Sequence, residues 1–107
     1  MAKKKLPQKV SSIVKRYIES LKQDNLKIKN IYIYGSYAKG TAHKDSDIDL
    51  CVVSPDFKKM DPWKYLWRKC LDTDTLYIQP VGFAPEDFVD ESPLVWEIKQ
   101  TGVRIKQ

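Results

Sequence analysis

The sequence has 107 residues, enough for one compact domain with its own core but with little room for a second substrate-binding module. A hydrophobic fraction of 42% and a charged fraction of 31% are ordinary for a globular chain, and no apolar run approaches the roughly 20 residues of a transmembrane helix. The formal charge of +5 is compatible with a nucleotide or RNA ligand but does not establish either.

We therefore predict a single domain over residues 1–107, with residues 1–6 as a solvated basic tail. The start MAKKKLPQK does not lead into the apolar stretch of a secretion signal, so we expect a cytoplasmic protein without membrane contact. The two cysteines, Cys51 and Cys70, lie in no metal-type cluster. They are interpreted as reduced core residues, which makes a zinc site an unattractive hypothesis.

The first predicted element is an amphipathic helix over residues 7–24. Pro7 suits its first turn. Apolar residues recur at spacings of three and four, with lysines and Glu19 opposite. They are Val10, Ile13, Val14, Tyr17, Ile18 and Leu21. We interpret this helix as scaffold that covers one face of a sheet.

Residues 31–53, IYIYGSYAKGTAHKDSDIDLCVV, follow as strand, glycine turn, short helix, loop and second strand. Gly35 and Ser36 come directly after the first strand. Backbone N–H groups at such a turn are unpaired, and a helix start carries partial positive charge. This corner could therefore receive phosphate oxygens, with the Ser36 hydroxyl as a further donor and Gly35 allowing close approach.

The second strand opens with Asp47, Ile48 and Asp49. Alternate side chains of a strand share a face, so the two carboxylates project together while Ile48 points toward a core. Two adjacent carboxylates repel each other, and an oxygen-only site of this kind suits Mg²⁺ bound jointly by carboxylates and substrate phosphates. Taken separately, a Gly-Ser after a strand is usually only a turn, and an Asp-x-Asp is usually a solvated strand edge.

The spacing joins the two halves, because ten residues separate Ser36 from Asp47. This pattern between two strands resembles the signature of the DNA polymerase beta-like nucleotidyltransferase superfamily. The string GSYAKGTAHKDSDIDL is similar, almost residue for residue, to the minimal nucleotidyltransferases of bacteria and archaea, which usually have Arg where Lys39 stands. The resemblance implies that superfamily's α/β fold, a small mixed central sheet with flanking helices.

The resemblance also implies roles for the motif residues. Gly35 and Ser36 would grip the β- and γ-phosphates of a nucleoside triphosphate, and Lys39 would neutralise phosphate charge. Asp47 and Asp49 would hold Mg²⁺ or Mn²⁺ against the α-phosphate while pyrophosphate leaves.

The rest of the chain continues the alternation of helices and strands. Asp61 and Pro62 are a strong helix start. One apolar stripe follows, which we interpret as core in preference to a base-stacking platform or a partner surface: Trp63, Leu66, Trp67, Cys70 and Leu71. Residues 75–81 then read as a third strand, which lies at a sheet edge or is irregular at Pro80, because Pro80 has no N–H.

Two further helical segments and a short tail end the predicted fold. Pro85 opens a helical turn that runs through Phe88. Ser92 and Pro93 cap a helix that carries Leu94, Val95 and Ile98 and ends at Gly102, before a tail at 103–105. The order of elements predicts an α/β layer packing around a central sheet.

One position departs from the family pattern. In the family a third strand carboxylate helps to deprotonate the attacking hydroxyl, and related small members tend to carry an acid directly before the proline of a strand like YIQPVGF. That position here is Gln79, an amide that can accept a hydrogen bond but cannot act as a base and holds a metal weakly. Asp74 is a possible stand-in, but about 17 Å of extended chain separates it from Gln79.

Two hypotheses remain open. The first is an active nucleotidyltransferase that moves AMP or another NMP onto a hydroxyl, with a HEPN-type helical partner protein as acceptor, as in toxin–antitoxin pairs. The second is a catalytically weakened module that binds a nucleotide or a partner without turnover, because of Gln79. A homodimer is plausible, and nucleic acid enters only as an acceptor.

Two other features of the sequence contribute less to the functional prediction. A P-loop enzyme is set aside, because the chain lacks a glycine-rich loop that ends in Lys-Ser or Lys-Thr. His43, the one histidine, is interpreted as a solvated loop residue.

Overall fold

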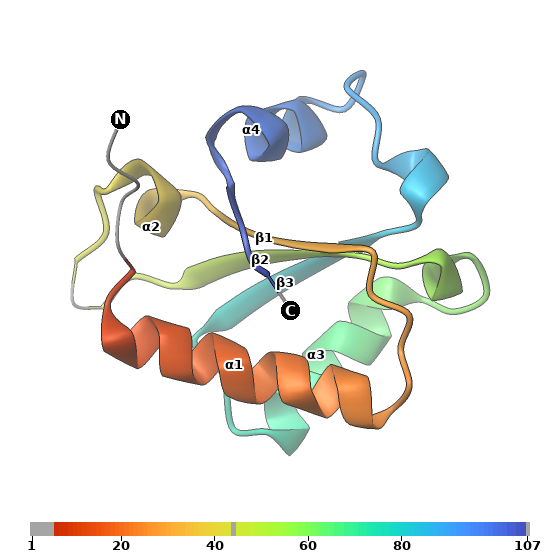
Figure 1. Ribbon diagram of the computed structural model, residues 1–107, viewed down its shortest axis with the longest axis horizontal. Helices are drawn as coiled ribbons and strands as arrows, with labels where there is room; N and C mark the ends of the chain where they lie inside the picture. Colours follow the sequence, from red (N-terminus) through yellow and green to blue (C-terminus); the bar gives the residue numbers. More distant parts are fainter. Residues whose placement is uncertain (1–5, 44, 107) are drawn as a thin grey trace.

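The computed structural model describes residues 6–43 and 45–106, which fold around one four-stranded sheet (Figure 1). Its strands are β1 (Asn30–Tyr34), β2 (Ile48–Val53), β3 (Ile78–Phe83) and β4 (Val103–Arg104), in the spatial order β3-β2-β1-β4. Strand β1 runs antiparallel to β2 and β4, whereas β2 and β3 are parallel. The predicted mixed sheet is confirmed, and β3 with Pro80 lies at its edge as expected.

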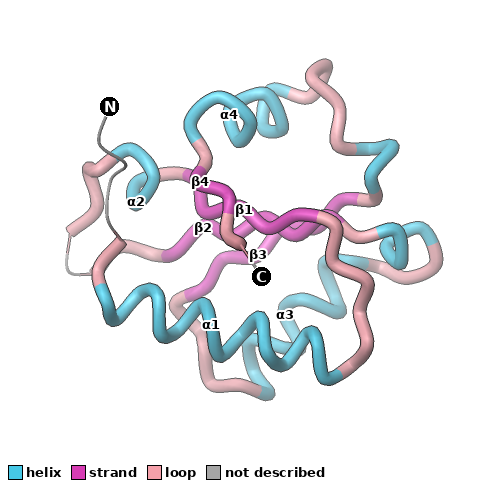
Figure 2. The backbone as a smooth tube through the Cα atoms, in the orientation of Figure 1, coloured by secondary structure: helices cyan, strands magenta, loops and turns pink. Residues whose placement is uncertain are grey.

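The helices form a layer on each side of this sheet. They are α1 (Gln8–Gln23), α2 (Ser36–Lys39), α3 (Pro62–Asp72) and α4 (Pro93–Thr101), with single 3₁₀ turns at Pro55–Lys58 and Pro85–Asp87. Helices α1 and α3 lie against one face and α4 lies over the other, while α2 stands at the end of β1 (Figures 1 and 2). None of the described helices is long and apolar enough to span a membrane.

The buried core divides between the two faces. The larger cluster joins α1 and α3 to the inward side chains of β1 and β2, including Ile31, Ile33 and Leu50, all fully buried. The smaller cluster lies under α4 and contains Cys51, Val53 and Ile98. Because side chains alternate along a strand, Asp49 belongs to the α4 face together with Cys51.

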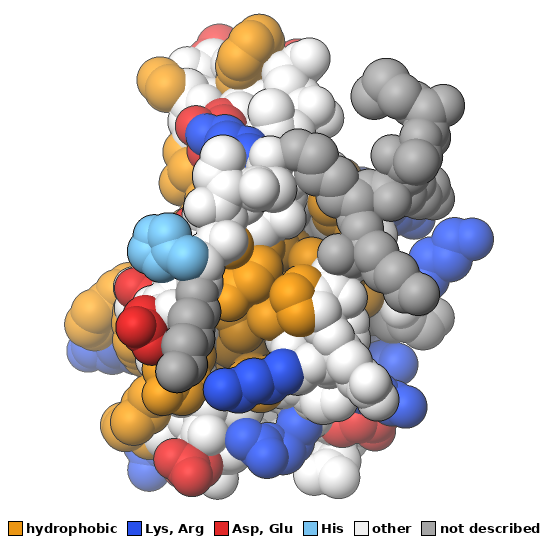
Figure 3. Space-filling model, turned by 90° about the vertical axis from the view of Figure 1, so that its left-hand side faces the viewer, with side chains coloured by type: hydrophobic (Ala, Val, Ile, Leu, Met, Phe, Trp, Pro, Cys, Tyr) orange, Lys and Arg blue, Asp and Glu red, His pale blue; other side chains and the backbone are white. Residues whose placement is uncertain are grey.

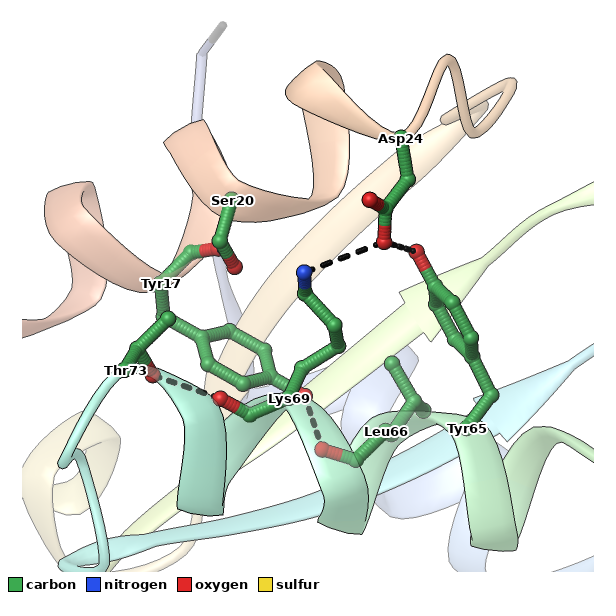
Figure 4. Close-up of polar contacts among 7 residues, drawn as sticks. All are labelled: Tyr17, Ser20, Asp24, Tyr65, Leu66, Lys69 and Thr73. Carbon is green, nitrogen blue, oxygen red and sulfur yellow. Dashed lines mark hydrogen bonds and ion pairs between the residues drawn. The ribbon is translucent and has the colours of Figure 1, made fainter.

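Polar contacts fix α1 against α3 (Figure 4). The buried Tyr17 hydroxyl donates to the Leu66 carbonyl at 2.8 Å. At the end of α1, the Asp24 carboxylate accepts from the Tyr65 hydroxyl at 2.7 Å and pairs with Lys69 at 3.1 Å. The hydrogen bonds from Tyr65 and Lys69 lower the pKa of Asp24.

Both predicted helix caps are present. The Asp61 carboxylate accepts from the Trp63 backbone N–H at 3.0 Å, and the Ser92 hydroxyl accepts from the Val95 N–H at 3.4 Å. The side chains of both cysteines are buried and free, as predicted.

Three expectations need correction. The α3 stripe is only partly core: Leu66 and Cys70 are fully buried, but Trp63 and Leu71 are 64% and 69% exposed. The third strand begins at Ile78, because residues 75–77 still form the turn after α3, and it extends to Phe83. The expected tail contains a strand, β4, whose two residues pair with β1. Residues 1–5 of the predicted basic tail lie outside the described residues.

Candidate active site

The Gly-Ser turn and the acidic pair are close together at one end of the sheet, where β1 ends and β2 begins. Gly35 has φ 73° and ψ −146°, a conformation that L side chains rarely adopt, and it leads directly into α2. A Cβ atom placed on Gly35 would lie 2.1 Å from Oδ2 of Asp49. The backbone of the turn therefore packs directly against the carboxylate, and a glycine is required for that approach.

The sheet register lines up three polar side chains in one row on the α4 face. Asp49 of β2 is paired with Tyr34 of β1 on one side and with Gln79 of β3 on the other. Directly paired residues on neighbouring strands place their side chains on the same face and close together. Gln79 thus lies beside Asp49, at the position where related small members of the family tend to carry an acid.

Negative charge accumulates around Asp49. Asp47 is exposed and lies one residue before β2. Burial raises the pKa of the Asp49 carboxyl, the charges of Asp47 and Glu97 raise it further, and Lys39 opposes them. The pKa of the Tyr34 phenol is also raised, to about 12. Burial is the largest cause, and the charges of Asp49, Cys51 and Glu97 add to it. A cation at this position would relieve the repulsion between the carboxylates.

Glu97 of α4 is a site residue that sequence reasoning missed. Its Oε1 lies 3.9 Å from Nζ of Lys39, and the two side chains are about half exposed. Its neighbours Val95 and Ile98 are fully buried, and this fixes the face of α4 that carries Glu97. Glu97 is far from the motif along the chain, so no local spacing connects it with Asp47 or Asp49.

The residues present fit a divalent cation only in a shared site. Among the described residues, no group of three or more Asp, Glu, His or Cys side chains is arranged to hold a metal ion by itself. Asp47 and Asp49 supply carboxylate oxygens, the donors that Mg²⁺ prefers, and Mg²⁺ is commonly bound by one or two carboxylates together with substrate phosphates. The donor set is therefore suited to a cation that arrives with a phosphorylated substrate.

The other candidate residues lie elsewhere. The Asp74 carbonyl accepts a hydrogen bond from Arg16 of α1, on the face of the sheet opposite to Asp49, so the structure does not bring Asp74 to the row. His43 is exposed in the loop before β2, and the histidine is visible on the surface in Figure 3. A hollow of about 190 Å³ is lined by Tyr37 and Ile48. Ile48 points away from Asp49 into the larger core cluster, so this hollow is separate from the acidic pair.

The chain is similar to known proteins over most of its length. A family model described as the nucleotidyltransferase domain matches residues 14–104. The chain belongs to the nucleotidyltransferase domain family. The resemblance to minimal nucleotidyltransferases is confirmed by this match and by the relatives below.

Two curated relatives of this nucleotidyltransferase are protein adenylyltransferases by name. MntA of Shewanella oneidensis is 48% identical over 40 residues, which are 36% of this chain and 29% of MntA. A protein of Methanocaldococcus jannaschii, named as a candidate protein adenylyltransferase, is 40% identical over 53 residues, which are 47% of this chain. The matched segment spans 60% of that archaeal protein. Both matches therefore cover less than two thirds of the relatives' lengths.

Solved structures show the same fold. A toxin–antitoxin complex with AMP-PNP contains a chain with a TM-score of 0.58 and 24% identity, covering 84% of this nucleotidyltransferase and 69% of that chain. A mutant of the MntA–HpeT toxin–antitoxin pair also has a TM-score of 0.58, at 22% identity and with the same coverage.

Proposed function

We propose that this nucleotidyltransferase transfers a nucleoside monophosphate, AMP from ATP, to a hydroxyl group on a partner protein and releases pyrophosphate. The observation that carries the proposal is the direct packing of Gly35 against Asp49, which joins a phosphate-receiving turn to an acidic pair. The names of the two curated relatives support a protein as the acceptor. The toxin–antitoxin complexes among the structural neighbours support a partner protein, and the resemblance to minimal nucleotidyltransferases implies a helical HEPN-type protein in that role.

In this mechanism the turn binds and the acidic pair orients the substrate. The Ser36 hydroxyl and the N–H groups at the start of α2 donate to the β- and γ-phosphates, and Lys39 neutralises part of their charge. Asp47 and Asp49 would hold Mg²⁺ or Mn²⁺, which supplies charge neutralisation at the phosphates when bound. The acceptor oxygen forms a bond to the α-phosphorus, and the bond from that phosphorus to the bridging oxygen breaks. Pyrophosphate leaves with the electron pair, and the acceptor proton passes to water.

Gln79 favours a second candidate function. It lies directly beside Asp49 in the sheet, and its amide cannot take a proton from the acceptor. A module that binds the triphosphate or a partner protein without turnover would retain the turn and the acidic pair and lose only the base.

Pyrophosphate release separates these functions. The assay uses each of the four NTPs with Mg²⁺ or Mn²⁺, with and without the protein encoded beside this one. Asp49→Asn should lower turnover at least about 100-fold, because it removes a carboxylate at the reacting phosphate. Asp45→Asn changes an exposed aspartate in the loop before β2; it is the matched control and should retain turnover.

Gln79→Glu completes the design. Turnover in the wild type that is lost in Asp49→Asn supports the transferase. A silent wild type with an active Gln79→Glu variant would instead favour the binding module. Silence in every variant, together with the absence of both triphosphate binding and partner binding, would contradict both.

A further inference from the structure

A carboxylate outside the motif lies near the candidate site. Glu97 lies on α4, which packs over the same face of the sheet as Asp49, and its Oε1 is 3.9 Å from Nζ of Lys39. Lys39 stands in α2, three residues after Ser36. Glu97 therefore interacts with the lysine, Lys39, that follows the phosphate-receiving turn.

The charge of Glu97 also reaches the row on the sheet. Burial is the main cause of the raised pKa values of Asp49 and Tyr34, and Glu97 contributes to both. Three carboxylates, those of Asp47, Asp49 and Glu97, thus act on a region where Lys39 opposes them. Glu97 does not complete a metal site, since no three acidic, His or Cys side chains among residues 6–43 and 45–106 are arranged to hold an ion.

This balance of charge discriminates between two forms of the same nucleotide. A metal-free nucleoside triphosphate carries about four negative charges near neutral pH, and each carboxylate repels it. Both forms draw Lys39 away from Glu97, but the metal-free form depends more on Lys39, because no bound cation shares the neutralisation of its phosphates. A triphosphate that carries a divalent cation has about half that net charge, and its cation is attracted by the same carboxylates.

We propose that Glu97 is a specificity-determining residue that makes the site reject metal-free triphosphate, by holding Lys39 and by repelling the bare phosphates. The inference rests on the proposed function, because it requires that the site bind a nucleoside triphosphate. It goes beyond that function by assigning selection of the metal-bound form to a helix residue that the motif does not include.

The test is equilibrium binding of AMP-PNP by calorimetry, with excess Mg²⁺ or with EDTA. Glu97→Gln should tighten metal-free binding about threefold to tenfold and change metal-loaded binding by less than about twofold to threefold. The ratio of the metal-free dissociation constant to the metal-loaded one should therefore fall. Glu97→Asp keeps the charge and should keep most of the wild-type ratio. Glu91→Gln, an exposed glutamate in the loop before α4, changes the net charge equally and should leave the ratio unchanged.

Lys39→Gln separates the two effects of Glu97. In that background Glu97→Gln should tighten metal-free binding less than it does in the wild type, because only direct repulsion remains. Circular dichroism and thermal melting establish that each variant is folded.

The outcomes are distinct. An unchanged ratio in Glu97→Gln, or weaker metal-free binding, overturns the role of Glu97 while wild-type binding with Mg²⁺ still supports the proposed function. A wild type that binds AMP-PNP in neither condition overturns both. A shift of equal size in Glu91→Gln would show a general charge effect and would also overturn the assignment to Glu97.

Discussion

Two features of Gly35, its backbone conformation and its contact with Asp49, both require a glycine. Its positive φ is one that only glycine adopts readily, and Oδ2 of Asp49 occupies the space of a Cβ. Substitution therefore acts in two ways, through the conformation of the turn and through displacement of the carboxylate.

We expect Gly35→Ala to lower the free energy of unfolding by about 1 to 3 kcal/mol, because alanine is strained at this φ and ψ. Turnover should fall about 100-fold, since a displacement of about 1 Å at reacting groups has effects of that size. Urea denaturation and pyrophosphate release measure the two quantities.

Gly40→Ala is the matched control. Gly40 ends α2 with φ 76° and ψ 20°, so alanine there also enters the left-handed region. It should lose about 1 to 2 kcal/mol of stability and keep most of its turnover. Equal loss of turnover in both variants would mean that strain in the motif, and not contact with Asp49, determines activity.

At the scale of the elements, α3 separates apolar residues that the sequence pattern groups together. Leu66 is fully buried, whereas Trp63 is 64% exposed and its ring lies against the Trp67 ring, with centroids 6.3 Å apart. The apolar stripe is wider than the surface that α3 shares with the sheet, so its margin faces solvent.

Leu66→Ala should lower the free energy of unfolding by about 2 to 5 kcal/mol, because it leaves a cavity between α3 and the sheet. Trp63→Ala should cost less than about 1.5 kcal/mol, the worth of one exposed aromatic contact. Urea denaturation of the two variants side by side measures the difference. Comparable losses would show that Trp63 is buried in solution, for example by a second copy, and dilution of the protein would then reduce its stability.

At the scale of the whole molecule, local patterns predicted most elements and the meeting of the two motif halves. The turn at Gly35 and the pair at Asp47 and Asp49 belong to adjacent antiparallel strands, so a short stretch of sequence contains the information that brings them together. Glu97 was missed because its approach to Lys39 depends on how α4 packs over the sheet, which no spacing encodes. Strand β4 was missed because two residues are too few for a period to be recognised.

The two thiols report on the stability of the whole fold. Cys51 in β2 and Cys70 in α3 are both fully buried, on opposite faces of the sheet. Burial raises the pKa of the Cys51 thiol to about 12 and also raises that of Cys70. Since the thiolate is the reactive form, each cysteine must be exposed by opening of the structure before it reacts.

We expect both thiols to resist a disulfide reagent at pH 8 in native buffer and to react fully in urea. Mass spectrometry of the peptides that contain Cys51 and Cys70 measures the labelling of each cysteine separately. If Mg²⁺ and ATP at tenfold the dissociation constant bind only the folded state, labelling should slow about elevenfold. Both cysteines should slow equally, because global opening exposes them together. Rapid native labelling of one cysteine would contradict this, and slowing confined to Cys51 would show that the nucleotide protects only the layer under α4.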